Sequence, residues 1–351
     1  MKKKLLSVLM AAVMVAGVGG VGAAQVKADD EKILGAGIYS ASDNFNSYIG
    51  KAITNACDGI FKTNIEDGQN DQSTQNNQVD TMLAKGASVV AVSVCDVTAA
   101  PTLIQKCKDA GNVPIIFFNK EITDYDVINS YENAYQVTST GGDYGASIQA
   151  QMVIDYWKEH PEMDKNGDGK LQLVYLMGDP GHTASQPRCD YLKSTIEDAG
   201  IEIDLLAEDT GMWVTATAKE KMDAWVSKYG DEIECCVAGN DAMALGALSA
   251  VEAAGFNTDG EESSKYIPIY GIDALPEILS KIESGEITGS VLQDAKTQGQ
   301  IIVKMAENLT SGKDAVDGIE GVEMEEEAKA VRVPYQAITK DNLDLAKSTY
   351  E

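Results

Sequence analysis

Short apolar runs alternate with amphipathic helical segments along this 351-residue chain, and no other feature limits its possible folds as much. A short apolar run predicts a buried strand, whereas apolar residues three and four apart predict a helix with one buried face. Parallel sheets covered by helices on both faces produce this alternation. A chain of this length most naturally forms two such units. We therefore predict an α/β fold with two doubly wound parallel-sheet lobes.

The predicted strands are 33–40, 89–94, 113–119, 171–177, 234–238, 267–273, 290–293 and 331–338. The predicted helices are one that begins after Asp43 and others near 99–110, 143–159, 185–199, 215–228, 241–254, 275–284 and 295–310.

The first 28 residues predict a secretory signal peptide that is not part of the fold. Three lysines precede an apolar run from residue 5 to about residue 18, and small residues then lead to cleavage positions at Ala23 or Ala28. The run is short and glycine-rich at its end, which disfavours a membrane anchor. No cysteine lies near the cleavage region, so we predict no lipid attachment. We expect an exported protein, located in the periplasm or outside the cell.

The charge and the cysteines limit the function classes. The formal charge is −27, and loss of the four lysines of residues 1–28 makes it −31. Such an acidic surface repels nucleic acid and anionic lipid, so we predict no nucleic-acid partner. The six cysteines lack metal-type spacing, and Cys235 and Cys236 alternate across a predicted strand, which disfavours a bond between them. We expect buried free thiols, with disulfides as the alternative in an oxidising compartment.

The segment Asp-Lys-Asn-Gly-Asp-Gly-Lys-Leu-Gln at 164–172 predicts a calcium-binding loop. Oxygen-bearing residues stand two apart in it, and Gly169 occupies the sixth position, where such a loop turns sharply. The twelfth position is Tyr175 rather than glutamate, so a full ligand set needs a carboxylate from a distant segment. A plain surface turn is the alternative. The ligands predicted within the loop are Asp164, Asn166, Asp168, the Lys170 carbonyl and Gln172.

Polar and aromatic side chains follow the predicted strands, at the ends where parallel sheets bind ligands. Carboxylates, amides and a guanidinium can pair with sugar hydroxyls, and flat rings cover the apolar faces of a pyranose. This mixture predicts a sugar site. Taken singly, Asp43 and Asn240 could only cap the helices that follow them, and Trp213 could belong to the core. The predicted site residues are Asp43, Phe45, Asn119, His182, Arg188, Trp213, Asn240, Asp273 and Gln293.

A family resemblance rests on ten short segments in a fixed order: Asp-Asn-Phe (43–45), Asn-Asp-Gln-Ser (70–73), Phe-Phe-Asn-Lys-Glu (117–121), 164–172, Pro-Gly-His (180–182), Met-Trp (212–213), Lys-Met-Asp-Ala-Trp (221–225), Asn-Asp-Ala-Met-Ala (240–244), Gly-Ile-Asp-Ala-Leu-Pro-Glu (271–277) and Val-Arg-Val-Pro-Tyr (331–335). They resemble the periplasmic galactose/glucose-binding proteins of bacterial ABC sugar transporters, in the periplasmic binding protein type I family. The resemblance covers residues 33–347. It implies two lobes joined by a three-stranded hinge, with crossovers near 138–140, 292–295 and 331–334. The implied lobes are 33–138 with 294–331, and 139–293 with 332–351, the second of which carries the calcium loop.

The resemblance also implies a role for each site residue. Phe45 and Trp213 would stack on the two faces of the sugar ring. Calcium would occupy the 164–172 loop, with Glu234 as the distant bidentate ligand. The residues that would bond the sugar hydroxyls are Asp43, Asn119, His182, Arg188, Asn240 and Asp273.

Two positions differ from the family pattern. Ala184 stands where the resemblance implies an aspartate that accepts a hydrogen bond from the anomeric hydroxyl, and Gln293 stands where it implies an asparagine. Alanine removes the demand for a free hydroxyl, which predicts weak discrimination between galactose or glucose and their methyl glycosides. The alternative is that Ser185, Gln186 or a water fills the space and selectivity stays normal.

We therefore predict a monomeric binding protein that captures a hexose of the D-galactose or D-glucose type, or a methyl galactoside, and delivers it to an ABC permease. The resemblance leaves open whether a chemoreceptor also reads the closed form. The alternative function is a secreted glycoside-processing enzyme that uses Asp43 and Asp273 as its acid pair. We expect Arg188 and nearby amides to keep both carboxyls ionised, which disfavours catalysis by a general acid. A sugar-responsive repressor shares this architecture but needs an N-terminal helix-turn-helix, and a predicted signal peptide stands there instead.

Overall fold

Seven strands form the first sheet of the computed structural model, which describes residues 32–139 and 142–350. The predicted signal peptide lies outside these residues. The strand order is β11-β12-β5-β4-β3-β1-β2, and every neighbouring pair is parallel except β11 with β12. The strands are β1 (Ile33–Ile38), β2 (Lys62–Asp67), β3 (Val89–Val92), β4 (Ile115–Phe118), β5 (Ala134–Ser139), β11 (Met324–Glu325) and β12 (Ala330–Val333).

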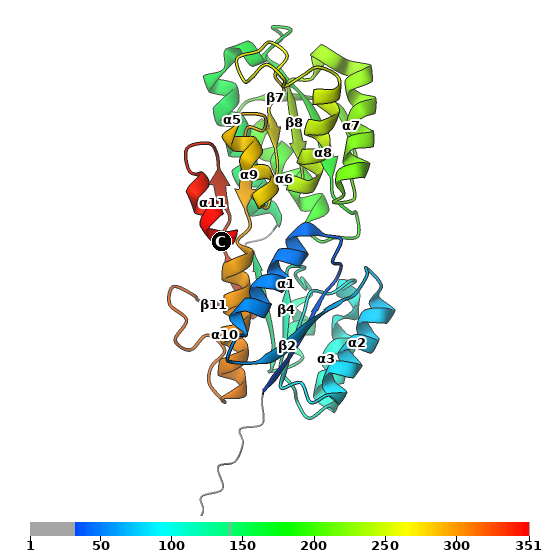
Figure 1. Cartoon of the computed structure of the whole chain (residues 1–351), viewed down its shortest axis with the longest axis vertical. Coiled ribbons are helices and arrows are strands. Elements are labelled where there is room, and N and C mark those ends of the chain that lie inside the picture. Colours follow the sequence, from blue (N-terminus) through cyan, green and yellow to red (C-terminus); the bar gives the residue numbers. More distant parts are fainter. Residues whose placement is uncertain (1–31, 140–141, 351) are drawn as a thin grey trace, which may run out of the picture. The chain divides into compact units, whose positions relative to one another are not determined.

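Helices cover both faces of the first sheet, as Figure 1 shows. Helices α1 and α10 pack on one face, where Val89 and Ala91 belong to their core, and α2 and α3 pack on the other with Val90 and Val92. This alternation along β3 is the period of two expected of a strand that is buried on both sides. The helices of this part are α1 (Asn44–Ala56), α2 (Gln72–Ala84), α3 (Ala100–Asp109), α4 (Tyr125–Asn129) and α10 (Ala295–Thr310), with a 3₁₀ turn at Val97–Ala99.

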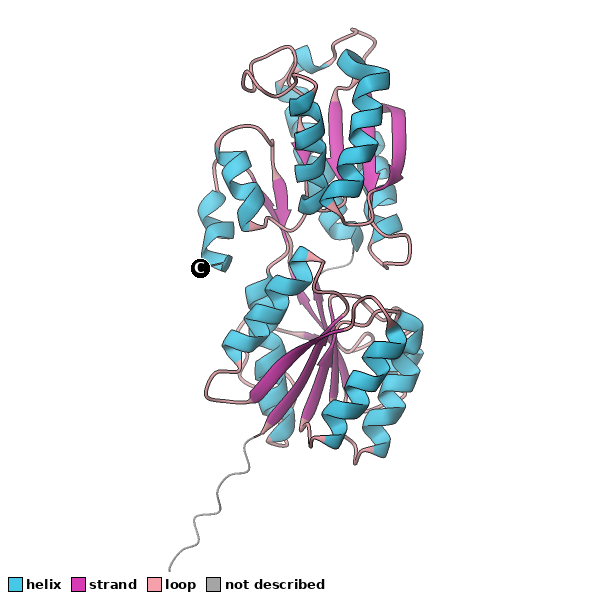
Figure 2. Ribbon diagram, turned by 45° about the vertical axis from the view of Figure 1, so that its right-hand side comes forward, coloured by secondary structure: helices cyan, strands magenta, loops and turns pink. Residues whose placement is uncertain are grey.

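The second sheet has four parallel strands in the order β7-β6-β8-β9. Isolated parallel bridges at Tyr270–Gly289 and Asp273–Leu292 continue it to β10, which pairs antiparallel with β13. The predicted α/β architecture with mainly parallel sheets is therefore confirmed (Figure 2). The strands are β6 (Lys170–Met177), β7 (Glu202–Thr210), β8 (Cys235–Ala238), β9 (Ile269–Tyr270), β10 (Ser290–Leu292) and β13 (Gln336–Ile338).

Helices also pack on both faces of the second sheet. Cys236 and Ala238 of β8 lie in the core with α7, α8 and α9, whereas Cys235 and Val237 lie in the core with α5 and α6. The two adjacent cysteines therefore point to opposite faces, as predicted, and all six cysteines are free thiols. The helices are α5 (Gly142–Glu159), α6 (Ser185–Asp198), α7 (Thr215–Tyr229), α8 (Asp241–Ala253), α9 (Pro276–Glu283) and α11 (Leu343–Tyr350), with 3₁₀ turns at Pro161–Met163 and Gly230–Glu232.

One predicted strand is wrong. The run 331–338 is not one strand, because β12 ends at Val333 in the first sheet and β13 begins at Gln336 in the second part of the chain. Pro334 separates them, since proline cannot donate to a sheet and restricts the residue before it. The prediction also omits five longer elements: β2, α2, β5, β7 and α11.

The chain passes between the two sheets after β5, after β10 and after β12, where the three crossovers are predicted. Residue 140 of the first crossover lies outside the described residues. The predicted lobe boundaries stay a prediction. Among the described residues, no helix combines the length and the apolar composition that crossing a membrane requires.

Candidate functional site

All nine predicted sugar-site residues line one cavity of about 20 Å³, together with Tyr39. They come from segments that follow strands of both sheets: β1 precedes Asp43 and Phe45, β4 precedes Asn119, and β6 to β10 precede the other six. The rule that ligands bind beyond the carboxyl ends of parallel strands thus locates the cavity. A volume of this size holds about one water, so the walls must separate to admit a sugar ring.

Two of the polar wall residues also cap helices. Asp43 accepts a hydrogen bond through Oδ1 from the Asn46 backbone N–H (2.8 Å), and Asn240 accepts one through Oδ1 from the Met243 N–H (3.0 Å). The capping alternative is therefore correct but incomplete, because both side chains also line the cavity. The cap hydrogen bond fixes the orientation of each side chain, because a backbone N–H group of the helix is its donor.

The indole ring of Trp213 packs directly over two glycines. A Cβ at Gly178 would lie 2.0 Å from Cζ2 of the ring, and one at Gly239 would lie 3.1 Å from Cζ3. Only glycine therefore leaves room for the indole at Gly178. The indole Nε1 is buried and has no hydrogen-bond partner among the described residues. Across the cavity, Phe45 is 5% exposed on α1, so the cavity has one aromatic wall from each part of the chain.

Arg188 holds the polar side of the cavity together. Its Nη1 donates to the Gly239 carbonyl (2.6 Å), and its Nη2 donates to Gln293 Oε1 (3.1 Å) and to the Tyr335 hydroxyl (3.2 Å). Its Nε is buried and unpartnered among the described residues. Burial opposes the positive charge, but Tyr335 and Asp273 outweigh it and raise the pKa of Arg188. The guanidinium thus remains a cation that can donate to a sugar oxygen.

His182 is a neutral side chain in this site. Burial lowers its pKa well below the usual value, and the nearby cations Lys120 and Arg188 lower it further. Its Nδ1 accepts the Ala184 backbone N–H at 3.1 Å. In the neutral ring the hydrogen is then on Nε2, which leaves Nε2 as a donor.

Asp273 departs from the expectation that Arg188 keeps both acidic side chains ionised. Burial raises the pKa of Asp273 well above its usual value, and Asp241 raises it further, whereas Arg188 only partly opposes this. Asp273 is 3% exposed, so loss of hydration outweighs the attraction of the guanidinium. The pKa of this carboxyl therefore shifts in the direction opposite to the one that its pairing with Arg188 would give.

Three site residues adopt backbone conformations that L-amino acids avoid. The φ angles are +64° at Asn119, +63° at Trp213 and +125° at Asp273, and Met212 next to Trp213 is at +56°. A positive φ costs about 1–3 kcal/mol outside glycine and persists only where surrounding contacts enforce it. Such residues concentrate at ligand-binding sites, which is where these three lie.

The sequence prediction omits one wall residue, Tyr39. Its hydroxyl donates to Asp43 Oδ2 at 2.6 Å, and Lys120 Nζ lies 4.0 Å from the centre of its ring. Burial, and after it Asp43, raises the pKa of Tyr39 well above its usual value, so the hydroxyl keeps its proton. The signal was available, because Tyr39 directly follows β1 and precedes Asp43.

The predicted calcium loop is ordered by its own hydrogen bonds. Asp164 accepts the N–H groups of Asp168 and Gly169 at 3.0 Å each, and Asp168 Oδ1 accepts the Lys170 N–H at 2.9 Å. The Asn166 amide donates to Asp168 Oδ2 at 3.1 Å. The loop thus has a compact turn whose oxygens face inward toward backbone donors.

Glu234 ties this loop to the second sheet. Its carboxylate is 1% exposed and accepts the Lys165 N–H (2.7 Å) and the Gln172 N–H (3.0 Å). Burial raises the pKa of Glu234, and these two backbone donors oppose that rise. The side-chain oxygen of Gln172 is buried without a partner among the described residues.

The donor set fits calcium in chemistry, because it consists of carboxylate, amide and carbonyl oxygens. The unpartnered side-chain oxygen of Gln172 supports that fit, because the same amide group donates through Nε2 to Asp168 Oδ2 in the loop. In the part of the chain that the structure describes, however, no three Asp, Glu, His or Cys side chains converge closely enough to hold a metal. Metal binding would therefore require these side-chain oxygens to converge more closely, and each carboxylate has enough lone pairs to keep its backbone donor while it does so.

A family model described as a periplasmic binding protein domain matches residues 36–314. The chain belongs to the periplasmic binding protein family. D-galactose/methyl-galactoside binding periplasmic protein MglB of Haemophilus influenzae is 42% identical over 313 residues, which cover 88% of this chain and 90% of that protein. A putative rhizopine-binding protein of Rhizobium meliloti is 29% identical and covers 85% of this chain and 88% of its own length.

Solved structures share the same fold. An ABC transporter solute binding protein from Bacillus halodurans with bound myo-inositol superposes with a TM-score of 0.72 at 27% identity, over 91% of this chain and 98% of that one. The arabinose-binding protein of Shewanella has a TM-score of 0.73 at 16% identity over 91% and 96%, which shows the fold alone. Members of the periplasmic binding protein family are extracytoplasmic solute receptors, and this protein is one of them.

Proposed function

We propose that this protein captures a hexose of the D-galactose or D-glucose type, or a methyl galactoside, and delivers it to the permease of an ABC transporter. The observation that carries the proposal is the single cavity lined by all nine sugar-site residues. The name of the relative from Haemophilus influenzae supports galactose or a methyl galactoside as the ligand. In this proposal the protein is exported by the predicted signal peptide and acts as a monomer.

The chemistry of the cavity suits a neutral polyhydroxy ring. Phe45 and Trp213 offer flat apolar surfaces, which match the two faces of a pyranose. Arg188 and His182 Nε2 are donors, and Asp43 offers carboxylate oxygens. Hydroxyl groups both donate and accept, so they can satisfy the donors and the acceptors at once. A carboxylated sugar would bring a second negative charge beside Asp43, which disfavours it.

Calorimetric titration with D-galactose, D-glucose, their methyl glycosides and a panel of pentoses tests this proposal. We expect a 1:1 complex with at least one hexose and a much weaker complex with the pentoses. Incubation with a chromogenic galactoside separates a receptor from an enzyme that uses Asp43 and Asp273. Stoichiometric binding without release of the chromophore supports the receptor, and turnover contradicts it.

We also propose that calcium binds in the 164–172 loop of this receptor. Asp164, Asn166, Asp168, Gln172, the Lys170 carbonyl and Glu234 would hold it. A bound divalent cation would supply positive charge to a loop that is rich in carboxylates. Glu234 would then link the loop to β8, as it already does through its bonds to Lys165 and Gln172.

A further inference from the structure

A second cavity of about 400 Å³ adjoins the proposed hexose site. The two cavities share four wall residues, namely Asn119, His182, Arg188 and Gln293. Arg188 is 5% exposed, and its buried Nε has no partner among the described residues, so one unpaired donor lies in the wall common to both. The two cavities therefore meet at these four residues, and a ligand that spans both cavities would contact them.

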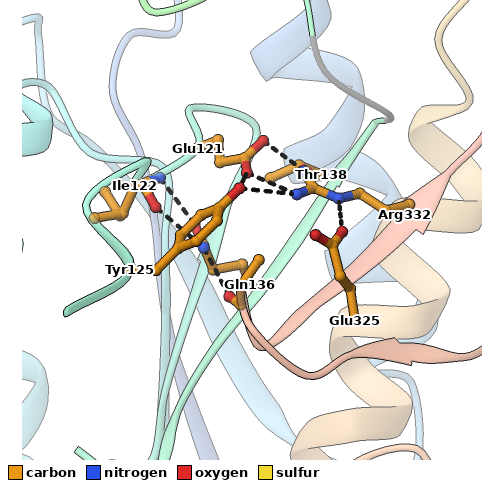
Figure 3. A network of polar contacts seen from close by, with 8 residues as sticks. Glu121, Ile122, Tyr125, Gln136, Thr138, Glu325 and Arg332 are labelled. Carbon is orange, nitrogen blue, oxygen red and sulfur yellow. Dashed lines mark hydrogen bonds and ion pairs between the residues drawn. The ribbon is translucent and has the colours of Figure 1, made fainter. Parts of the chain in front are cut away.

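The far wall of the second cavity is a fixed polar network, shown in Figure 3. Arg332 binds both oxygens of Glu121, from Nη1 to Oε2 at 2.5 Å and from Nη2 to Oε1 at 2.7 Å. Its Nε also donates to Glu325 (2.8 Å), and Nη1 donates to Thr138 Oγ1 (3.0 Å). The Tyr125 hydroxyl donates to Glu121 Oε1 at 2.9 Å. A bidentate pair that is supported on several sides holds its geometry before any ligand binds.

This wall selects a neutral, hydroxyl-bearing occupant. Glu121 and Arg332 neutralise each other on this far wall. Arg188 on the shared wall remains a cation, and it can donate to a sugar oxygen. Tyr125 and Tyr191 contribute rings with hydroxyl groups, and Thr183 adds another hydroxyl. Aromatic faces and hydroxyl groups are the same chemistry that binds sugar rings in the first cavity.

Ala184 lies beside the shared wall, because its backbone N–H donates to Nδ1 of His182, which lines both cavities. It belongs to the wall of the second cavity but not to that of the first. It precedes α6, and it makes no side-chain cap to that helix, so a methyl group is all that it presents. A larger side chain here would occupy space that belongs to the second cavity.

We propose that the protein also binds hexosides, with the hexose in the first cavity and a second sugar ring or similar polyol in the second. Sugars are joined to one another through the anomeric carbon, so that carbon would face the shared wall beside Ala184. A volume of about 400 Å³ falls within the range of about 300–1,000 Å³ typical of small-molecule sites and accommodates a ring, whereas a methyl group would leave most of it to water. This inference rests on the proposed hexose-binding function.

Calorimetric titration of the full protein with D-galactose, methyl galactoside, melibiose and lactose tests the inference, because the two disaccharides carry a galactosyl group in α and β linkage. We expect at least one disaccharide to bind within tenfold of galactose, or tighter. If both bind more than tenfold weaker than galactose, the second cavity takes no sugar and the inference is wrong, while the proposed function stands. If no hexose or glycoside binds at all, the proposed function fails and this inference fails with it.

Variants of residues that line only the second cavity distinguish the roles of the two cavities. Ala184→Phe should lower the affinity for the disaccharide at least tenfold and the affinity for galactose less than threefold. The control Ala184→Ser should leave both affinities within threefold of the wild type. An equal loss for both ligands in Ala184→Phe would contradict the inference. Tyr191→Ala provides a second variant that does not threaten the fold, since this side chain is 47% exposed. Tyr191→Ala should weaken binding of the disaccharide and leave the affinity for galactose unchanged. Unchanged affinity for both ligands would contradict a role for the second cavity.

Discussion

The guanidinium of Arg188 lies over the indole ring of Trp213, with its central carbon 5.6 Å from the ring centre. Arg188 lines the cavity, and its Nη1 and Nη2 atoms donate hydrogen bonds to Gly239, Gln293 and Tyr335. Such a cation–π contact is worth about 0.5–2 kcal/mol, depending on how well it is shielded from water. Arg188 thus helps to hold the ring that the proposed sugar would stack on.

Replacement of Trp213 by alanine should weaken hexose binding by about 1–3 kcal/mol, because the stacking surface and its apolar burial are lost. Titration calorimetry measures this loss. Trp225→Ala is the matched control, since Trp225 packs against the core on α7 and does not line the cavity. Equal affinity in wild type and Trp213→Ala would show that the indole does not contact the sugar.

Hexose binding should also make the protein more compact. The cavity combines Phe45 of the first sheet's α1 with Trp213 of the segment after β7, and its volume of about 20 Å³ is too small for a ring. The walls must therefore open for entry, and contacts of the sugar with both rings then favour closure. Small-angle scattering with saturating galactose should show a smaller radius of gyration than without it. The same curve in both conditions would exclude a hinge motion.

A chelator should lower the melting temperature if calcium occupies the 164–172 loop. A ligand bound only by the native state stabilises it by about 2.7 kcal/mol at a hundredfold excess over Kd. Glu234→Ala should largely abolish the response to chelator, whereas Glu232→Ala, an exposed neighbour, should keep it. A melting curve of the wild type that chelator leaves unchanged would argue against the metal site.

Stability should fall with rising pH because of one buried carboxyl, Asp241. It accepts hydrogen bonds from Ser290 Oγ (2.6 Å) and the Leu275 N–H (2.7 Å). Burial raises its pKa to about 7, although those two bonds and Arg188 oppose the rise and Glu277 adds to it. The folded pKa thus exceeds the unfolded value of about 3.9. The stabilising contribution is full below about pH 4 and is lost as pH rises toward 7, at up to about 1.4 kcal/mol per pH unit.

Urea denaturation of wild type and Asp241→Asn between pH 4 and pH 8 measures this effect. The difference in unfolding free energy between the two proteins should change across that range in the stated direction. Ser290→Ala removes a donor that stabilises the ionised form, so it should raise the pKa and move the fall to higher pH. A difference that does not vary with pH would show that Asp241 does not titrate in the folded protein.

The pattern of the buried strands was readable from the residues themselves. The apolar run at 89–94 predicts β3, since each of its side chains meets a helix-covered face. The helix boundary at Asp43 was equally local, because an aspartate before an apolar helical pattern satisfies free N–H groups. The rule that ligands bind at the carboxyl ends of such strands then located nine of the ten wall residues.

Two of the elements that the prediction omits, β2 and α2, lack this local signal. β2 (Lys62–Asp67) has no fully buried residue, and α2 buries only Gln75, Val79 and Met82. β2 lies at the edge of the first sheet and pairs only with β1, so its sequence shows little apolar periodicity. Its formation depends on hydrogen bonds that β1 offers, which is a tertiary property.

The sequence by itself therefore determined the alternation of strands and helices, the helix caps and the identity of most wall residues. Only the tertiary structure decided the backbone conformations and the pKa values of those residues. Trp213 adopts a positive φ angle that no local preference of a bulky residue selects, and Gly178 is needed only because that indole, from another segment, lies on it. Likewise, the pKa of Asp273 depends on burial and on Asp241, 32 positions earlier in the chain. Burial and contacts between distant segments arise only when those segments pack together, so no single stretch of the sequence predicts them.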